Sequence, residues 1–260
     1  MNKNKRNIIN NFKKKNIVLG TWSHLIDPKA IEAIASTNID FLIIDLEHGP
    51  HSYSETINII NAIENMGKFA FVRIPHNNSS DILRSLDSGA HGIFVPHISS
   101  PNEAKSALNN CLYGNELNSR GVSTLSKSSL YDYDNQLEYL NSENKFINLS
   151  IMIEDQKGLE SLDEIIEIKG VNYIFLGTYD LYTSLKMNKR NNKVYSAEMY
   201  TLINKISKKC KRKKIKLGSH APNYKIANKL IECGVNLITM NVDITILKLG
   251  FQEFIKNVKR

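Results

Sequence analysis

Eight short apolar runs alternate along the chain with segments of helical periodicity, and this alternation limits the possible folds more than any other feature. The runs lie at 17–22, 41–48, 69–75, 92–98, 147–154, 171–177, 215–220 and 236–241. Near-continuous apolar strands separated by helices are typical of a parallel sheet covered on both faces. Eight of them fit a closed barrel better than an open doubly wound sheet, and no glycine-rich dinucleotide or phosphate loop follows any run. The sequence therefore predicts an α/β fold, a single (β/α)8 TIM barrel domain over 1–260, with the basic residues 1–16 as an N-terminal extension or helix.

Composition argues against several classes of protein. No apolar run reaches 18 residues and no signal-like stretch follows the basic amino end, so we expect a cytoplasmic protein with no membrane partner. The cysteines Cys111, Cys210 and Cys233 lack metal-ligand spacing and are expected to be reduced and structural. The formal net charge is +8, but the densest basic run, 208–214, ends a helix predicted over 195–212 and has no aromatic platform. We favour a solvated helix end over a phosphate-binding patch there, and we expect no nucleic-acid partner.

Polar side chains follow most of the predicted strands. In a barrel, residues that follow a strand emerge at the carboxyl-end face, where such barrels build their active sites. The polar residues at these positions are Trp22, Asp45, Glu47, His48, Arg73, His97, Glu154, Asp180 and His220. Asp45 has an alternative role as a cap of the following helix. The other histidines singled out, His51, His76 and His91, are expected to be surface or loop residues.

Glu154 and Asp180 point to a metal ion. Two carboxylates at the ends of neighbouring strands repel one another unless a cation lies between them, and oxygen ligands suit Mg²⁺ or Mn²⁺. A 2-oxo acid chelated at such a metal would be polarised toward an enolate. Arg73 would stabilise the developing oxyanion, and His48 would move the proton because its ordinary pKa lies near neutrality. Proton transfer beside a polarised carbonyl is the chemistry of an aldolase.

Several ordered motifs give the chain a resemblance to a known family. They are GTW at 20–22, D-x-E-H-G-P at 45–50, VRIP at 72–75, LDSGAHGIFVP at 86–96, RG at 120–121, I-x-I-E at 151–154 and GVNYIFLGTYDL at 170–181. From about residue 17 to 250 the sequence resembles the metal-dependent (class II) HpcH/HpaI aldolases, which cleave 4-hydroxy-2-oxo acids to pyruvate and an aldehyde.

The resemblance implies a role for each matching residue. It makes His48 the base, paired with Asp87 from a neighbouring subunit, and it makes Arg73 the holder of the enolate oxygen. Glu154 and Asp180 would bind Mg²⁺ or Mn²⁺, with Co²⁺ as a further candidate, and Trp22 would line the pocket. Asp45 and Glu47 would orient the residues that contact the substrate without contacting it themselves. The resemblance also implies a phosphoenolpyruvate/pyruvate-type barrel and a homo-oligomer, usually a hexamer with exchanged final helices.

The chain departs from the family pattern close to the expected substrate. Met152 stands where the family usually has glutamine. Tyr179, within Gly177-Thr178-Tyr179-Asp180, would crowd the backbone amides that normally meet the pyruvate carboxylate. His220 replaces a common apolar residue and can offer a hydrogen bond to a polar substrate. These changes favour an aldolase of altered specificity, and they leave open another lyase or decarboxylase reaction on the same metal site, or a barrel that binds a ligand without turnover.

Overall fold

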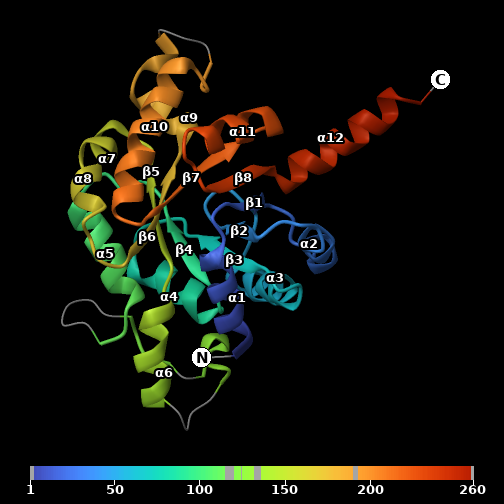
Figure 1. Cartoon of the computed structure of the whole chain (residues 1–260). Coiled ribbons are helices and arrows are strands. Elements are labelled where there is room, and N and C mark those ends of the chain that lie inside the picture. Colours follow the sequence, from blue (N-terminus) through green and yellow to red (C-terminus); the bar gives the residue numbers. More distant parts are fainter. Residues whose placement is uncertain (1–2, 115–119, 124, 132–135, 190–192, 259–260) are drawn as a thin grey trace.

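A computed structural model describes residues 3–114, 120–123, 125–131, 136–189 and 193–258 of the chain. Its eight strands form one closed parallel barrel in the order β1 to β8, so the TIM barrel prediction is confirmed (Figure 1). The strands are β1 (Val18–Ser23), β2 (Phe41–Asp45), β3 (Phe69–Arg73), β4 (Gly92–Val95), β5 (Leu149–Ile153), β6 (Val171–Leu176), β7 (Lys216–Ala221) and β8 (Leu237–Val242). Each strand overlaps one of the eight apolar runs.

Helices surround the barrel and also cover its amino-terminal end. The α-helices are α1 (Lys3–Lys14), α2 (Pro28–Ala35), α3 (Tyr53–Asn65), α4 (Ser79–Asp87), α5 (Pro101–Cys111), α6 (Gln136–Glu143), α7 (Gln156–Glu160), α8 (Leu162–Ile165), α9 (Thr178–Ser184), α10 (Ala197–Arg212), α11 (Tyr224–Glu232) and α12 (Asp243–Lys256). Short 3₁₀ turns lie at η1 (Lys127–Ser129), η2 (Asn144–Phe146) and η3 (Met187–Lys189). None of the helices in the described ranges is both long and apolar enough to cross a membrane.

Side-chain caps fix where many of the helices begin. Ser52 and Ser100 each form a complete capping box with a glutamate three residues later, at the starts of α3 and α5. An N-cap side chain contributes about 0.5–2 kcal/mol to stability. Because these caps close the strand-to-helix turns at the carboxyl end of the barrel, they fix the backbone that frames the pocket described below.

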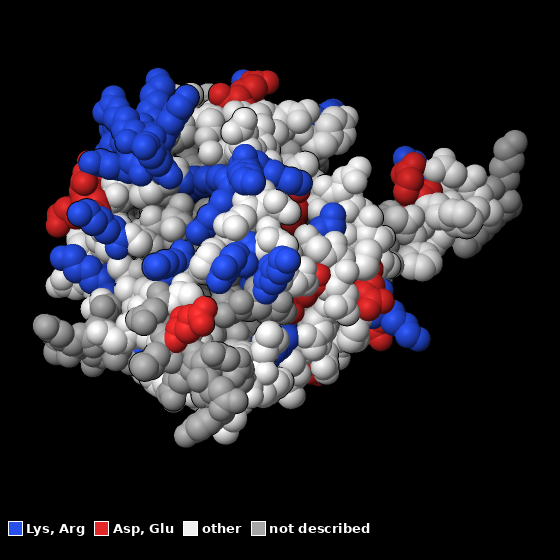
Figure 2. All heavy atoms as spheres, turned by 60° about the horizontal axis from the view of Figure 1, so that its bottom comes forward, with Lys and Arg blue, Asp and Glu red and all other residues white. Residues whose placement is uncertain are grey.

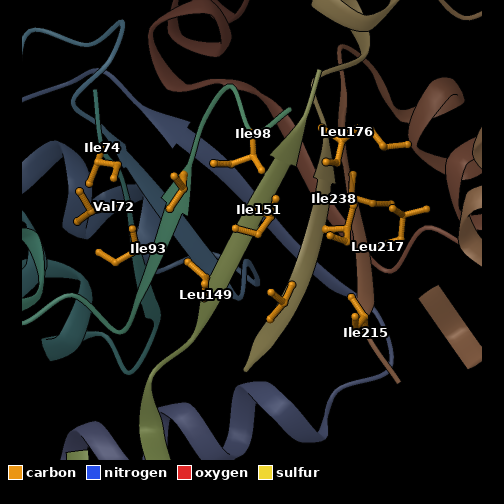
Figure 3. Packing of buried hydrophobic residues seen from close by; sticks show 14 of the residues in the cluster. Val72, Ile74, Ile93, Ile98, Leu149, Ile151, Leu176, Ile215, Leu217 and Ile238 are labelled. Carbon is orange, nitrogen blue, oxygen red and sulfur yellow. The ribbon is translucent and has the colours of Figure 1, made fainter. Parts of the chain in front are cut away.

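The core has two layers, which lie inside and outside the barrel wall. The outer layer is aliphatic and packs between the strands and the surrounding helices (Figure 3). The inner layer is mainly aromatic and includes Phe41, Phe71, Phe94 and Phe175, all at most 1% exposed. Burying one such ring stabilises the fold by about 1.5–3 kcal/mol. The interior is therefore filled with side chains, and any ligand must bind at an end of the barrel.

Helix α1 closes the amino-terminal end. Its Phe12 stacks on Phe69 with ring centroids 4.2 Å apart and meets Phe41 edge-on at 5.8 Å. Phe41 and Phe69 are the first residues of β2 and β3, so α1 seals the end at which the strands begin. Only the carboxyl-terminal mouth remains available for the site that the sequence predicts.

Helix α12 projects away from the barrel at the carboxyl end of the chain (Figure 1). Along its length Asp243 alone is buried, whereas Ile246, Leu249, Phe251 and Phe254 are between 47% and 73% exposed. A helix with this much exposed apolar surface is typical of an interface with another protein surface.

Candidate active site

A pocket of about 260 Å³ opens at the carboxyl ends of the strands. Most of the site residues predicted from the sequence line it, although they come from six separate strands or strand ends. The lining residues are Trp22, His24, Asp45, His48, Arg73, Met152, Glu154, Phe175, Gly177, Thr178, Tyr179, Asp180, His220 and Val242. Of the strand-end residues named from the sequence, Glu47 and His97 are not in this lining.

A buried ion pair between Asp45 and Arg73 forms one wall of the pocket. The guanidinium donates from Nε to Asp45 Oδ1 (2.8 Å) and from Nη2 to Oδ2 (2.5 Å), a bidentate arrangement. Burial alone would raise the pKa of Asp45, but the hydrogen bonds and charge of Arg73 outweigh it and hold that pKa below its ordinary value. Asp45 is therefore a carboxylate that orients Arg73, and α3 takes Ser52 as its cap instead.

Arg73 is held on two further sides. Its Nη1 lies 3.0 Å from Glu47 Oε2, and the guanidinium stands 4.4 Å from the ring centroid of Trp22. The indole of Trp22 is fixed in turn, since its Nε1 donates to Thr239 Oγ1 at 3.0 Å. A guanidinium has five N–H donors, and the hydrogen bonds to Asp45 use two of them. Donors therefore remain for an oxygen of a bound molecule.

Glu154, which follows β5, also lines the pocket and is 5% exposed. The backbone N–H of His97 donates to its Oε1 (2.6 Å), and the imidazole Nδ1 of His97 lies 3.1 Å from the same oxygen. The other ring nitrogen of His97 contacts Glu47 Oε1 at 2.8 Å. Burial raises the pKa of Glu154; the N–H and charge of His97 oppose this, and the carboxylates of Glu47 and Asp180 add to it. A positive ion beside Glu154 would offset the burial and the carboxylate repulsion that disfavour its charged form.

Gly177 provides the space that Glu154 occupies. A Cβ at this position would lie 2.5 Å from Glu154 Oε2 and 2.7 Å from Glu154 Cβ, both far inside ordinary contact. The resemblance associates Gly177 with substrate binding, and the structure shows that Gly177 also leaves room for the Glu154 side chain. Only glycine lets the β6–α9 turn pass so close to the carboxylate.

Asp180 completes the acidic side of the pocket from the first turn of α9, where it is exposed. Glu154 and Asp180 are thus brought to one cavity, as the sequence predicts. No group of three or more His, Cys, Asp or Glu side chains forms a metal-binding cluster within the described part of the chain. A metal ion here would take two protein carboxylates and leave its other positions to water or substrate.

His48 and Asp87 do not meet within a single chain. His48 is exposed at the rim of the pocket, and its backbone N–H donates to Asp45 Oδ1 at 3.2 Å. Asp87 ends α4, does not line the pocket, and has its Oδ1 2.5 Å from Nη2 of the buried Arg120. This separation agrees with the expectation that Asp87 acts in a neighbouring subunit, and it leaves the pairing itself a prediction.

The three departures from the family pattern lie together on the pocket wall. Met152 is 2% exposed and belongs to the inner core layer, whereas Tyr179 is 49% exposed at the rim. His220 contacts Thr239 Oγ1 through Nδ1 at 3.2 Å, and burial lowers its pKa to about 4. His220 is therefore neutral at physiological pH and offers hydrogen bonds without charge.

Sequence reasoning missed several contributors. His24, whose Nε2 lies 3.0 Å from Asp45 Oδ2, follows β1 directly and has the same strand-end signal as the residues that were assigned. His97 was noted at a strand end but given no role. Tyr195 bridges Thr178 Oγ1 (3.0 Å) and the carbonyl oxygen of His220, and no local pattern marks it.

Of the remaining histidines, His91 lies in the loop between α4 and β4, within the expectation of a surface or loop residue, but it is not at the surface. His91 is 1% exposed: its Nδ1 accepts the backbone N–H of Ala70 (2.9 Å) and its Nε2 lies 2.9 Å from Glu64 Oε1. This histidine, which precedes β4, contacts Glu64 of α3 and the ring of Phe69 at the start of β3, and the sequence pattern did not indicate its burial. The three cysteines are free and buried, as expected.

Comparisons with known proteins agree with this fold. Residues 18–248 match the family model described as HpcH/HpaI aldolase/citrate lyase. A 5-keto-4-deoxy-D-glucarate aldolase of Escherichia coli O6:H1 is 27% identical over 247 residues, which cover 95% of this chain and 94% of the relative. An HpcH/HpaI aldolase/citrate lyase family protein from Burkholderia cenocepacia J2315 superposes with a TM-score of 0.88 at 23% identity, covering 98% and 99% of the two chains. The citrate synthase SbnG superposes with a TM-score of 0.80 at 22% identity, covering 97% and 95%.

Proposed function

Because this chain belongs to the HpcH/HpaI aldolase/citrate lyase family, we propose that it is a cytoplasmic, metal-dependent lyase that cleaves or forms a 4-hydroxy-2-oxo acid through a pyruvate-like enolate. The barrel would act as a single catalytic domain spanning 1–260. The observation that carries the proposal is that Glu154, Asp180 and the immobilised guanidinium of Arg73 line one pocket. Two acidic oxygen ligands and a cation with unused donors in the same pocket suit a chelated 2-oxo acid.

The acidic side of the pocket fits a divalent metal. Glu154 is buried with its pKa raised in part by Asp180 and Glu47, and Gly177 leaves room for its carboxylate. Hard oxygen ligands favour Mg²⁺ or Mn²⁺, with Co²⁺ as a further candidate. Such an ion, when bound, would supply Lewis-acid polarisation of the substrate carbonyl.

Arg73 would stabilise the negative charge that develops on the carbonyl oxygen. Its orientation is fixed by Asp45, Glu47 and Trp22 before substrate arrives, so little reorganisation is needed during the reaction. Removing one preorganised donor of this kind costs roughly 10²–10³ in rate. Asp45 and Glu47 thus act through Arg73 and need not touch the substrate.

His48 would move the proton, with Asp87 of a neighbouring subunit as its orienting partner. This role requires an oligomer, and two features support one. The apolar face of α12 is exposed, and a groove of about 480 Å³ with mainly apolar walls runs between α2 and the start of α12. We propose a homo-oligomer, up to a hexamer, in which α12 of one subunit covers an apolar surface of the next.

The pocket wall points to a substrate that differs from that of the E. coli relative. Met152 cannot supply the amide hydrogen bond of a glutamine, and the loss of one such bond to a charged ligand costs about 1–3 kcal/mol. Tyr179 narrows the mouth, and the neutral His220 adds a polar contact. These changes suit an altered 2-oxo acid or aldehyde. Since the fold also carries a citrate synthase, another lyase or decarboxylase reaction on the same groups is the alternative.

Metal-dependent deuterium exchange into a panel of 2-oxo acids tests the proposal without knowledge of the aldehyde. We expect exchange at the carbon beside the carbonyl of pyruvate or a close analogue, loss of exchange after chelation, and recovery with Mg²⁺ or Mn²⁺. Absence of exchange from every acid, with metal bound, would mean that the barrel does not form enolates. Exchange followed by loss of CO₂ without aldehyde formation would support the decarboxylase alternative.

A further inference from the structure

The amino-terminal end of the barrel, opposite the candidate active site, carries a dense field of lysines. Figure 2 looks toward this end and shows Lys and Arg side chains spread over it, with few acidic residues between them. Three hollows lie on this face, as shown by the residues that line them: Phe69 begins β3, Gly170 precedes β6 and Asn236 precedes β8. We call this surface the basic face.

The first hollow, of about 400 Å³, lies between α1 and the start of β3. Lys14, Lys15 and Lys68 line it. Its single carboxylate, Asp40, is already paired with the ammonium of Lys15. Lys14 has no ion-pair partner among the residues that the structure describes, so it carries an uncompensated charge.

The second hollow, of about 530 Å³, lies between α1, the end of α5 and the start of β6. Lys13, Lys145 and Lys169 line it, and none of the described residues in its lining is acidic. Lys145 and Lys169 are exposed, and within the described ranges neither forms an ion pair. Anions entering here would therefore meet ammonium groups without competition from a neighbouring carboxylate.

The third hollow, of about 290 Å³, lies at the amino ends of β7 and β8. Lys211, Lys214 and Lys216 line it, and the lining residues that the structure describes include no carboxylate. It is joined to the first, because Lys216 donates to the backbone carbonyl of Lys15 and lies 5.8 Å from the ring centroid of Phe12. Three lysine-lined recesses thus follow one another around α1.

Neighbouring lysines outside the hollows behave differently. On the same helix end, Lys209 pairs with Asp163 at 2.6 Å and Lys213 pairs with Glu167 at 2.5 Å. The chain therefore pairs cations at the flank of α8 and α10, whereas Lys15 alone of the hollow-lining lysines has an ion-pair partner within the described residues. A concentrated positive potential of this kind attracts polyanions.

The lining chemistry distinguishes between possible polyanions. None of the large exposed hydrophobic residues of the described chain lines a hollow, so nothing there would insert into a bilayer, and a flat membrane would touch only the rims. The aromatic residues in the lining, Phe12 and Phe69, are 3% and 1% exposed and cannot stack on bases. The phosphate backbone of a duplex projects outward and can enter hollows of this kind. Lysine binds a phosphate as a point charge, and such a contact does not depend on the base sequence.

From these observations we propose that the basic face binds the phosphate backbone of double-stranded nucleic acid, independently of base sequence. Inspection of the run 208–214 alone led to the opposite expectation, because the other lysines come from segments far apart in the sequence. The proposed binding goes beyond the lyase function and uses no residue of the candidate active site.

Two charge-matched triple variants test the proposal. Lys14→Glu, Lys169→Glu and Lys211→Glu remove one exposed cation from each hollow. The control combines Lys105→Glu, Lys157→Glu and Lys225→Glu, which change exposed lysines in the amino-terminal halves of α5, α7 and α11, toward the carboxyl end of the barrel. Each substitution removes two units of positive charge, so both variants fall from a net charge of +8 to +2. Pyruvate deuterium exchange at the wild-type rate would show that both variants fold.

Binding is measured by fluorescence anisotropy of a labelled duplex DNA over a range of salt concentrations. We expect the wild-type protein and the control to bind, and the basic-face variant to bind at least about tenfold more weakly, with a salt dependence shallower by roughly three in log–log slope. Equal affinities of the two variants would overturn the proposal. So would binding to vesicles containing phosphatidylserine without binding to the duplex.

Discussion

Replacing Gly177 by alanine should damage the candidate metal site while leaving the fold intact. The backbone at this position, with φ −73° and ψ 77°, suits alanine as well as glycine, so the substitution carries no conformational penalty of its own. The obstacle is Glu154. The new Cβ would stand 2.5 Å from Oε2, and ordinary contact begins at 3.4 Å, so the two groups must separate by 0.9 Å.

A displacement of this size has a predictable consequence for the reaction. A shift of about 1 Å in a positioned group costs on the order of 10²-fold in rate, which corresponds to about 2.7 kcal/mol. The second close contact, 2.7 Å from Glu154 Cβ, prevents a simple rotation of the carboxylate from relieving the clash. We therefore expect both Mn²⁺ affinity and pyruvate deuterium exchange to fall by roughly this factor.

The assay combines Mn²⁺ titration calorimetry, deuterium exchange and thermal unfolding. Gly121→Ala is the matched control, because the nearest atom to its new Cβ is a Leu83 methyl carbon at 3.8 Å. We expect the control to resemble wild type in all three measurements, and Gly177→Ala to differ only in the first two. If Gly177→Ala binds Mn²⁺ and exchanges deuterium as wild type does, Glu154 is not a metal ligand in the position described.

Three further substitutions test other parts of the reasoning. Replacing His48 by alanine should slow deuterium exchange by about 10²–10⁴-fold with nearly unchanged metal affinity; equal activity would exclude His48 as the base. Replacing Met152 by glutamine should improve pyruvate handling by about 10- to 100-fold in kcat/KM; an unchanged profile would assign the divergence to other wall residues. Burial opposes ionisation of Glu64, but its contacts with His91 and Lys127 outweigh this and lower its pKa to about 2. Glu64 should therefore stabilise the fold above about pH 4.5 and lose this contribution as pH falls toward 2. Urea unfolding should show Glu64→Gln to be less stable at pH 7 by about 1–3 kcal/mol, with a difference that shrinks in acid; a difference independent of pH would contradict the assignment.

The sequence predicted best those features that depend on residues close together along the chain. Every strand lies within or overlaps an apolar run, because a parallel barrel buries both faces of each strand and leaves a run of Ile, Val, Leu and Phe. Strand-end positions also located Trp22, Asp45, Arg73, Glu154 and Asp180 on one pocket, since all strands of such a barrel point the same way. The same rule indicates His24, which was overlooked.

Contacts between distant segments were beyond the reach of the sequence. The burial of His91, the use of Tyr195 as a bridge to His220 and the fit of Gly177 against Glu154 depend on which side chains meet across the barrel. Asp87 was singled out through the family resemblance, but its contact with Arg120 and its distance from the pocket of its own chain are tertiary facts.

By itself the sequence determined the barrel, its strand order and the end at which chemistry can occur, because periodicity and strand polarity are properties of short segments. Only the tertiary structure decided how Arg73 is immobilised, why Glu154 is under electrostatic stress, and that lysines from five separate segments share one face. Electrostatic fields and steric fit depend on distances in space, and folding brings together charges and surfaces that lie far apart along the chain.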